Sequence, residues 1–249
     1  TVLNALTLDM GISVEQYGEE FVRQVARAVG KMIANARAGL GGIPMDSNSL
    51  NIIIPGNYLG LVGYLTFDGK DTNWTSATAG TTADKSGYGN TGTLTSMAQS
   101  TTPAVGKIGQ ALNFDGVDDY VDIGTGPTVV NTVSFWVYPQ TTTEYFINLT
   151  GTTDYIWADA GTITATGVAS PTIYVDGVVS STLAAGRWQY VVVTSATSEN
   201  ASNLDIGRTQ DTNYLEGRMD DVHLYNRALS EKEVRQLYRL GESKFNTSP

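Results

Sequence analysis

The stretch NFDGVDDYVDIG, residues 113–124, decides how this chain is to be interpreted. Five of its twelve residues are Asp or Asn, and they stand at the edge of a run that otherwise alternates like a strand. Such a density of carboxylates suits a catalytic or metal-binding cluster. It also suits a strand–turn–strand in which the Asp side chains accept hydrogen bonds from turn amides. The first alternative predicts an enzyme or a metal site, and the second predicts a β-sheet scaffold.

The composition is typical of all-β proteins with many turns. The chain has 249 residues, of which 41% are hydrophobic and 16% are charged, and Thr, Gly, Ser and Asn are abundant. The formal net charge of −10 argues against a nucleic-acid partner, because binding phosphates requires clustered Lys and Arg. The chain has no cysteine and one histidine, His223, which excludes disulfides, thiolate nucleophiles and any site that needs two histidines.

No segment predicts a membrane span or an export signal. The chain lacks a run of ~18 apolar residues, and its N-terminus lacks a basic region followed by a continuous apolar region. A signal that was cleaved or otherwise removed before Thr1, or a removed initiator Met, would each be compatible with this start, and these alternatives stay open.

Residues 13–38 predict one amphipathic helix, with a capping box at Ser13 and Gln16. Its apolar residues recur at steps of three and four, and we expect these members to mediate assembly: Tyr17, Phe21, Val25 and Met32. The apolar stripe can pack on the adjacent domain, or it can dock another chain of an oligomer or larger assembly. Residues 43–57 predict a linker, so residues 1–57 form an N-terminal helical arm and linker.

From there to about residue 229 the chain predicts short strands separated by turns, which is typical of a β-sandwich or barrel. The expected strands are residues 61–67, 92–94, 111–114, 120–123, 132–138, 145–149, 154–157, 162–166, 172–175, 178–183, 188–194, 204–206 and 219–225. Asp176–Gly177 predicts a tight hairpin. Residues 230–240 predict a short C-terminal helix, capped by Ser230 and Glu233 and ended by Gly241.

Eight segments in order carry a resemblance to a known family. They are GLVGYLTFDG, DKSGYGNTGTL, GKIGQALNFDGVDDYVDIG, TVSFWVYP, IYVDG, RWQYVVVT, LDIGR and LEGRMDDVHLYNRALSEKEVRQLY. Together they resemble the laminin-G-like, concanavalin-A-like lectin and glucanase jelly roll, in a compact bacterial or phage surface-protein form. The resemblance covers residues 58–241 and leaves 242–249 as a tail. In one departure, Trp188 follows the Asp176–Gly177 hairpin, whereas the Trp-bearing strand precedes it in the common form.

The resemblance favours the turn interpretation of residues 113–124, with Asp115–Gly116 as the turn and Tyr120 opening the next strand. Enzymes with this jelly roll carry a Glu-x-Asp-x-Glu strand, and none occurs here. Asp118–Asp119 and Asp220–Asp221 are adjacent pairs, which point to opposite faces within a strand. His223 has no nucleophile-elbow sequence to serve. We therefore expect a protein that is not an enzyme.

The Gly-rich loop DKSGYGN predicts one structural Ca²⁺, held by Asp84, Asn90 and Asp220. Side-chain and backbone oxygens suit this ion, and jelly rolls similar to this one often hold it. The alternative is a glycine turn that Asp84 and Asn90 cap.

A sugar platform requires exposed aromatic rings, and the candidates in loops are Trp74, Tyr88 and Tyr214. Six aromatic residues, among them Tyr214 again, are spread through the predicted sandwich, and most of them are expected in the core or in cross-strand packing: Tyr145, Tyr155, Trp157, Tyr174, Trp188 and Tyr214. The resemblance implies a noncatalytic, surface-displayed recognition or adhesion protein that binds carbohydrate or another surface ligand. The N-terminal arm, which the resemblance does not cover, suggests in addition that the helix anchors the protein in an assembly. Its location would be extracellular, on a cell surface or on a virion. The alternative is an accessory carbohydrate-binding domain of a polysaccharide-degrading enzyme, or a divergent enzyme of that kind.

Overall fold

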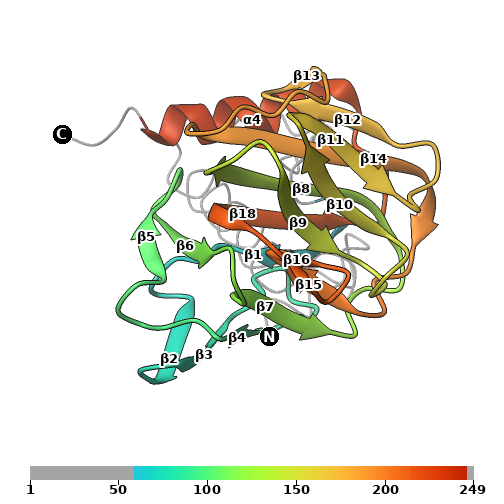
Figure 1. Cartoon of the computed structure of the whole chain (residues 1–249). Coiled ribbons are helices and arrows are strands. Elements are labelled where there is room, and N and C mark those ends of the chain that lie inside the picture. The colour runs from blue at the N-terminus through green and yellow to red at the C-terminus, as the bar shows by residue number, and fades with distance from the viewer. Residues whose placement is uncertain (1–58, 246–249) are drawn as a thin grey trace, which may run out of the picture. The chain divides into compact units, whose positions relative to one another are not determined.

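The computed structural model describes residues 59–245, which form two large antiparallel sheets and one helix (Figure 1). The predicted N-terminal helix, with Tyr17, Phe21, Val25 and Met32, lies outside the described residues. The expected class, a mainly β protein with a β-sandwich, is confirmed. In the described part, no helix is long and apolar enough to cross a membrane.

The first sheet has the order β13-β12-β14-β8-β18-β6-β5, and β1 also pairs with β18. Its strands are β1 (Leu61–Leu65), β5 (Pro103–Val105), β6 (Gln110–Asp115), β8 (Val130–Pro139), β12 (Thr172–Val175), β13 (Val178–Val179), β14 (Gln189–Glu199) and β18 (Glu216–Tyr225). The last strand of the described residues, β18, therefore lies inside the sheet, between β8 on one side and β6 and β1 on the other.

The second sheet has the order β11-β10-β9-β15-β7-β4-β3-β2. Its strands are β2 (Thr72–Ser76), β3 (Ala79–Thr82), β4 (Gly92–Thr95), β7 (Tyr120–Gly124), β9 (Glu144–Asn148), β10 (Tyr155–Asp159), β11 (Thr162–Thr166) and β15 (Leu204–Ile206). A small hairpin of β16 (Arg208–Thr209) and β17 (Asn213–Tyr214) follows β15.

The core lies between the inner faces of the two sheets. Alternate residues of β8 enter it, so that Phe135 and Val137 meet Phe146 and Ile147 of β9 in one buried cluster. Phe146 and Ile147 are adjacent in sequence, and both enter the core because the pairing of β9 with β10 is irregular at this point. The rings of Phe135 and Phe146 are 5.4 Å apart. This alternation leaves the polar and remaining aromatic side chains on the two outer faces, which is where a ligand has access.

Several local predictions are confirmed by the register. Tyr174 pairs with Val179 and Val175 with Val178, so Asp176–Gly177 forms the predicted two-residue hairpin turn. Both turn residues have positive φ, 52° and 81°, which a tight hairpin of this kind requires. The strands β2, β3 and β5 were not predicted, because their sequences TNWTS, AGTT and PAV lack alternating apolar residues.

Helix α4, Glu231–Phe245, follows the last strand. The predicted capping box is present: Ser230 N donates to Glu233 Oε2 at 2.8 Å, and Glu233 N donates to Ser230 Oγ at 3.4 Å. The prediction that Gly241 ends the helix is wrong, because the helix continues to Phe245. Gly241 lies against the indole of Trp136, where a Cβ atom would collide with the ring. This residue is glycine because the helix packs closely on the sheet.

The expectation for Asp220–Asp221 is also wrong. Asp220 is the cross-strand partner of Trp136 on the outer face, and Asp221 accepts a hydrogen bond at 2.9 Å from the hydroxyl of Tyr64, which lies on the same face. A bulge between Asp220 and His223, with Asp221 at a φ of 50°, breaks the alternation of β18. Both carboxyl groups therefore lie on the outer face of the first sheet.

Candidate functional site

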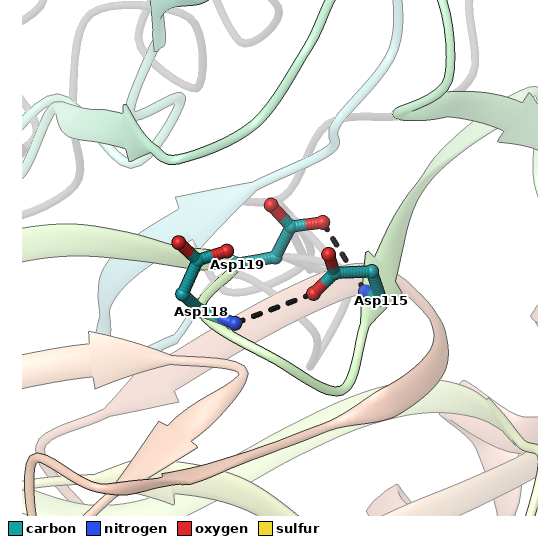
Figure 2. A group of neighbouring side chains, drawn as sticks. All are labelled: Asp115, Asp118 and Asp119. Atoms are coloured by element: carbon teal, nitrogen blue, oxygen red, sulfur yellow. Dashed lines mark hydrogen bonds between the residues drawn. The ribbon is translucent and has the colours of Figure 1, made fainter.

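The acidic turn between β6 and β7 is built by its own aspartates (Figure 2). Asp115 Oδ1 accepts hydrogen bonds from Val117 N at 2.8 Å and Asp118 N at 3.3 Å. Asp119 Oδ2 accepts one from Asp115 N at 3.2 Å. The interpretation of these residues as turn-forming is confirmed, since the carboxylates satisfy amides that the turn leaves unpaired.

The same three carboxyl groups are close enough to hold a cation. One oxygen of each of Asp115, Asp118 and Asp119 lies within 4.8 Å of the others. Burial, with the charge of Asp115 next, raises the pKa of Asp119 to about 6. Asp115 and Asp118 are exposed, and exposed acidic groups commonly cluster without an ion. The hydrogen bonds of the turn account for this arrangement.

Asp84 and Asn90 lie together, as predicted, with the contacts of a capped turn. Asp84 Oδ1 accepts from Tyr64 N and Ser86 N, and its Oδ2 accepts from Ser86 Oγ, Asn90 N and Asn90 Nδ2, all at 2.8–2.9 Å. The Asn90 amide nitrogen also donates to Val62 O at 2.8 Å. These are the contacts of the turn-capping alternative, and they engage both oxygens of the predicted Ca²⁺ ligand Asp84.

The third predicted ligand, Asp220, contacts a different loop. Its Oδ2 accepts from Ile108 N at 2.8 Å, and its Oδ1 is buried without a hydrogen-bond partner among the described residues. Burial, followed by the charge of Asp221, raises the pKa of Asp220 to about 8. Ca²⁺ binds carboxylate, amide and backbone carbonyl oxygens. The shared calcium site of Asp84, Asn90 and Asp220 stays a prediction.

The three predicted ligand-binding aromatics do not form one platform. Trp74 is on β2 at the edge of the second sheet and packs partly against the core. Tyr88 is a loop residue with 48% of its side chain exposed. Tyr214 of β17 lies 6.4 Å, between ring centroids, from Tyr120 of β7, and β4 and β3 separate that strand from Trp74.

A better platform lies on the outer face of the second sheet, and its centre is the pair Tyr145 and Trp157. They are cross-strand partners on β9 and β10, with ring planes 6° apart and centroids 6.1 Å apart. Both rings are partly exposed. Trp157 Nε1 donates to Thr166 Oγ1 on β11 at 3.1 Å, which fixes the orientation of the indole.

Polar groups border this aromatic pair. Tyr155 faces outward two residues before Trp157, and its hydroxyl accepts from Gln210 Nε2 at 2.8 Å. Asp205 of β15 is fully buried, and its Oδ2 accepts from Arg208 Nη2 at 2.8 Å and from Asn148 Nδ2 at 3.2 Å. Burial raises the pKa of Asp205, and the pairing with Arg208 opposes that rise.

Arg208 also holds the aromatic side chains beyond the pair. Its guanidinium carbon is 3.7 Å from the ring centroid of Tyr120, a close cation–π contact. The outer face therefore presents Tyr145 and Trp157, then the Gln210 and Arg208 side chains of the hairpin, then Tyr120 and Tyr214. We call the pair Tyr145 and Trp157, with the bordering Tyr155 and Gln210, the aromatic face.

Sequence reasoning assigned Tyr145, Tyr155 and Trp157 mostly to packing. The signal that distinguishes them is period two: Ile156 and Ala158 are buried, so Tyr155 and Trp157 must face outward. Parallel aromatic rings beside amide and hydroxyl groups are suited to stack on the C–H face of a sugar ring while hydrogen-bonding its hydroxyls.

No protein-family model matches the chain, and no curated protein sequence matches it. Among solved structures, domain 4 of AbnA, a GH43 extracellular arabinanase from Geobacillus stearothermophilus, in complex with arabinotriose, is 18% identical with a TM-score of 0.48. That match covers 72% of this chain and 98% of the domain. Trypanosoma rangeli sialidase is 14% identical with a TM-score of 0.47, over 91% of this chain and 40% of the sialidase.

The binding domain of Paraclostridial Mosquitocidal Protein 1 is 15% identical with a TM-score of 0.47, over 75% of this chain and 53% of that one. The chain thus spans about half or less of the sialidase and of the mosquitocidal protein structure. Likenesses of this size say nothing about the activity of this chain.

Proposed function

We propose that this chain is a noncatalytic carbohydrate-binding protein with a laminin-G-like jelly roll, and that its aromatic face binds the ligand. The observation that carries the proposal is the parallel pair of Tyr145 and Trp157, partly exposed on adjacent strands and held by hydrogen bonds. Ring stacking needs such preorganised, accessible aromatic surfaces. Its location would be extracellular, on a cell surface or virion, with the N-terminal segment anchoring it in an assembly.

Affinity from a few stacked rings and hydrogen bonds is modest. We expect a monovalent Kd between about 1 mM and 1 μM, equivalent to roughly −4 to −8 kcal/mol. Display in an oligomer would raise the apparent affinity without new contacts. A multimerised protein on a broad glycan array therefore gives the first measurement, with arabinotriose, the ligand in the arabinanase-domain structure, as one of the probes.

The decisive comparison uses variants of the aromatic face. Trp157→Ala and Tyr145→Ala are each expected to weaken binding to an array hit by about tenfold or more, because each removes half of the stacking surface. Trp157→Phe retains a ring and is expected to keep part of the affinity. Tyr88→Ala removes the exposed ring that the sequence alone suggests as a ligand contact, and it is expected to leave binding unchanged if the aromatic face is the site.

Two outcomes would contradict the proposal. A folded Trp157→Ala variant that binds like the wild type would exclude the aromatic face as the site. Release of reducing sugars from a polysaccharide hit, lost in a folded Asp119→Asn variant, would establish the rival enzyme function. Unchanged thermal melts check that each variant is folded.

A further inference from the structure

Arg218 occupies a separate position on the outer face of the first sheet. It lies on β18, with Asn113 of β6 as its cross-strand partner on one side and Tyr138 of β8 on the other. The neighbouring residue Met219 enters the core, so Arg218 and its two partners face outward. The guanidinium carbon lies 5.4 Å from the ring centroid of Tyr138, and Trp188 meets that ring edge-on at 5.8 Å. We call these four residues the Arg218 row.

The charge of Arg218 is not balanced by a carboxylate. Among the partly buried basic side chains of residues 59–242, Lys107, Arg208 and Arg227 are ion-paired with Glu242, Asp205 and Glu233. Within the same residues, the side chain of Arg218 makes no ion pair and no hydrogen bond, and its Nε is a buried donor without a partner. Arg218 as a whole is only partly buried, so its side chain is open to an anion from solution.

A partly buried guanidinium with an unused donor is a preferred partner for an oxyanion. Its planar fork matches a carboxylate or a sulfate with two parallel hydrogen bonds, and it can stay stacked on an aromatic ring while it does so. A buried donor that stays unpaired costs free energy, and an anion that accepts from it removes that cost. The side-chain amide of Asn113, which makes no hydrogen bond within the described residues, adds a donor and an acceptor beside the charge.

We propose that the Arg218 row binds an anionic saccharide, with its carboxylate or sulfate paired to Arg218 and its ring against Tyr138 and Trp188. Two partly exposed aromatic rings next to the charge favour a ring-bearing anion over a bare one. The chain's net charge of −10 opposes a polyanion as long as a nucleic acid. This site is independent of the aromatic face, which lies on the other sheet.

Glu216 sets a limit on the affinity. It is the next outward residue along β18, it is exposed, and it pairs across the sheet with Asp115. No ion pair joins its carboxylate to Arg218 among the described residues. Its negative charge, one outward position along the strand from Arg218, repels an incoming oxyanion. Glu216→Gln is therefore expected to strengthen binding of the same ligand.

The test is a titration of the full chain by NMR, observed at the Nε–Hε resonance of Arg218. The probes are D-glucuronate, D-galacturonate and D-glucose 6-sulfate, with D-glucose as the neutral probe at equal ionic strength. We expect at least one anionic sugar to shift this resonance saturably and to bind about tenfold or more tightly than glucose. Whether the uronates or the sulfate bind identifies the anion.

Matched variants separate this site from general charge effects. Arg218→Gln has no Nε–Hε resonance, so binding to each variant is measured by isothermal titration calorimetry with the same sugars. Arg218→Gln is expected to lose the binding, whereas Arg187→Gln, which removes an exposed charge paired with Asp176 next to Trp188, is expected to keep it. Trp157→Ala, a change in the aromatic face, is also expected to keep binding of the anionic sugar. The two proposed sites can therefore be tested, and can fail, independently of each other. The proposal is overturned if no anionic sugar shifts the Arg218 resonance, or if a folded Arg218→Gln binds like the wild type. A hexaglutamate peptide that binds as tightly as the sugars would overturn the saccharide assignment.

Discussion

Asp220 links a loop to the first sheet, and its burial makes the stability of the protein depend on pH. The carboxyl is fully buried, and it accepts from the backbone of the GKIG loop, residues 106–109. Gly106 passes so close that a Cβ atom would lie 2.5 Å from Asp220 Oδ2. On the other side of the loop, Asp68 Oδ1 accepts from Gln110 N at 3.0 Å. The loop is thus held at both ends by carboxyl groups.

The raised pKa of Asp220 predicts a fall in stability with rising pH. An unfolded Asp titrates near 3.8 and the folded one near 8, so between these values the unfolded state releases a proton that the folded state keeps. The free energy of unfolding then decreases by at most about 1.4 kcal/mol per pH unit. Asp220→Asn lacks this titration and keeps an acceptor for Ile108 N. We expect its melting temperature to exceed that of the wild type most at pH 8, with the difference vanishing towards pH 4.

Denaturant unfolding across this pH range measures the effect. Asp159→Asn, a change of an exposed carboxylate on β10, provides the control. An Asp220→Asn variant less stable than the wild type at pH 8 would show that the carboxylate is ionised and stabilised in the folded protein.

The Asp84 turn carries the calcium prediction. Asp84→Ala removes the acceptor of five hydrogen bonds, so we expect a lower melting temperature in chelator alone, by several degrees for a loss of about 1–3 kcal/mol. Melts with calcium and with chelator, on protein first freed of metal, test the ion separately. A calcium-dependent rise in the wild type that the variant lacks would bear out the sequence-based site, and identical wild-type melts would contradict it.

The roles of Asp115, Arg218 and the aromatic face differ in how far they can be predicted from the sequence. Asp115 forms the turn through an Asp-Gly pair and the amides two and three residues further on. Because all of these groups are close in sequence, this role can be predicted from the sequence alone. Arg218 is different, because the absence of a carboxylate partner depends on which strands flank β18. The aromatic face is intermediate: period two marks Trp157 as outward, but its neighbour Tyr145 comes from pairing.

At the scale of elements, helix α4 joins the sheet through a close contact rather than through its cap alone. Trp136 of β8 contacts Tyr238, with ring centroids 5.8 Å apart, and Lys107 lies 4.7 Å above the Trp136 ring. Lys107 also pairs with Glu242 of the helix at 2.5 Å. The sequence predicted the start of α4 correctly because capping is local, and it misplaced the end because Gly241 serves a contact with a distant strand.

Gly241→Ala tests this account, since two effects oppose each other. Alanine favours an exposed helix by about 1 kcal/mol over glycine. A methyl group at this position collides with the Trp136 indole, and overpacking typically costs about 1–3 kcal/mol. We expect a net loss of stability in denaturant unfolding. Gln236→Ala, an exposed position of the same helix, is the control and is expected to be neutral or slightly stabilising. A stabilised Gly241→Ala variant would mean that the helix end is not held against the sheet.

At the scale of the whole molecule, the predicted role of the N-terminal segment lies outside the described residues and stays a prediction. Phe21→Asp with Val25→Asp places charges in the proposed apolar stripe. We expect this double variant to reduce the mass in solution, measured by light scattering, while the melting transition of the sandwich is unchanged. If the double variant instead melts the sandwich, the helix packs within its own chain and the assembly role fails.

The position of β18 has a consequence for how the chain is made. This strand, Glu216–Tyr225, is synthesised after the other strands of the described residues, yet it pairs with β8, β6 and β1. Until it arrives, β8 presents an unpaired apolar edge, which is the kind of surface that aggregates or recruits chaperones. The first sheet can therefore close only after residue 225 has left the ribosome. A chain interrupted before residue 216 would lack the strand that joins the two halves of this sheet.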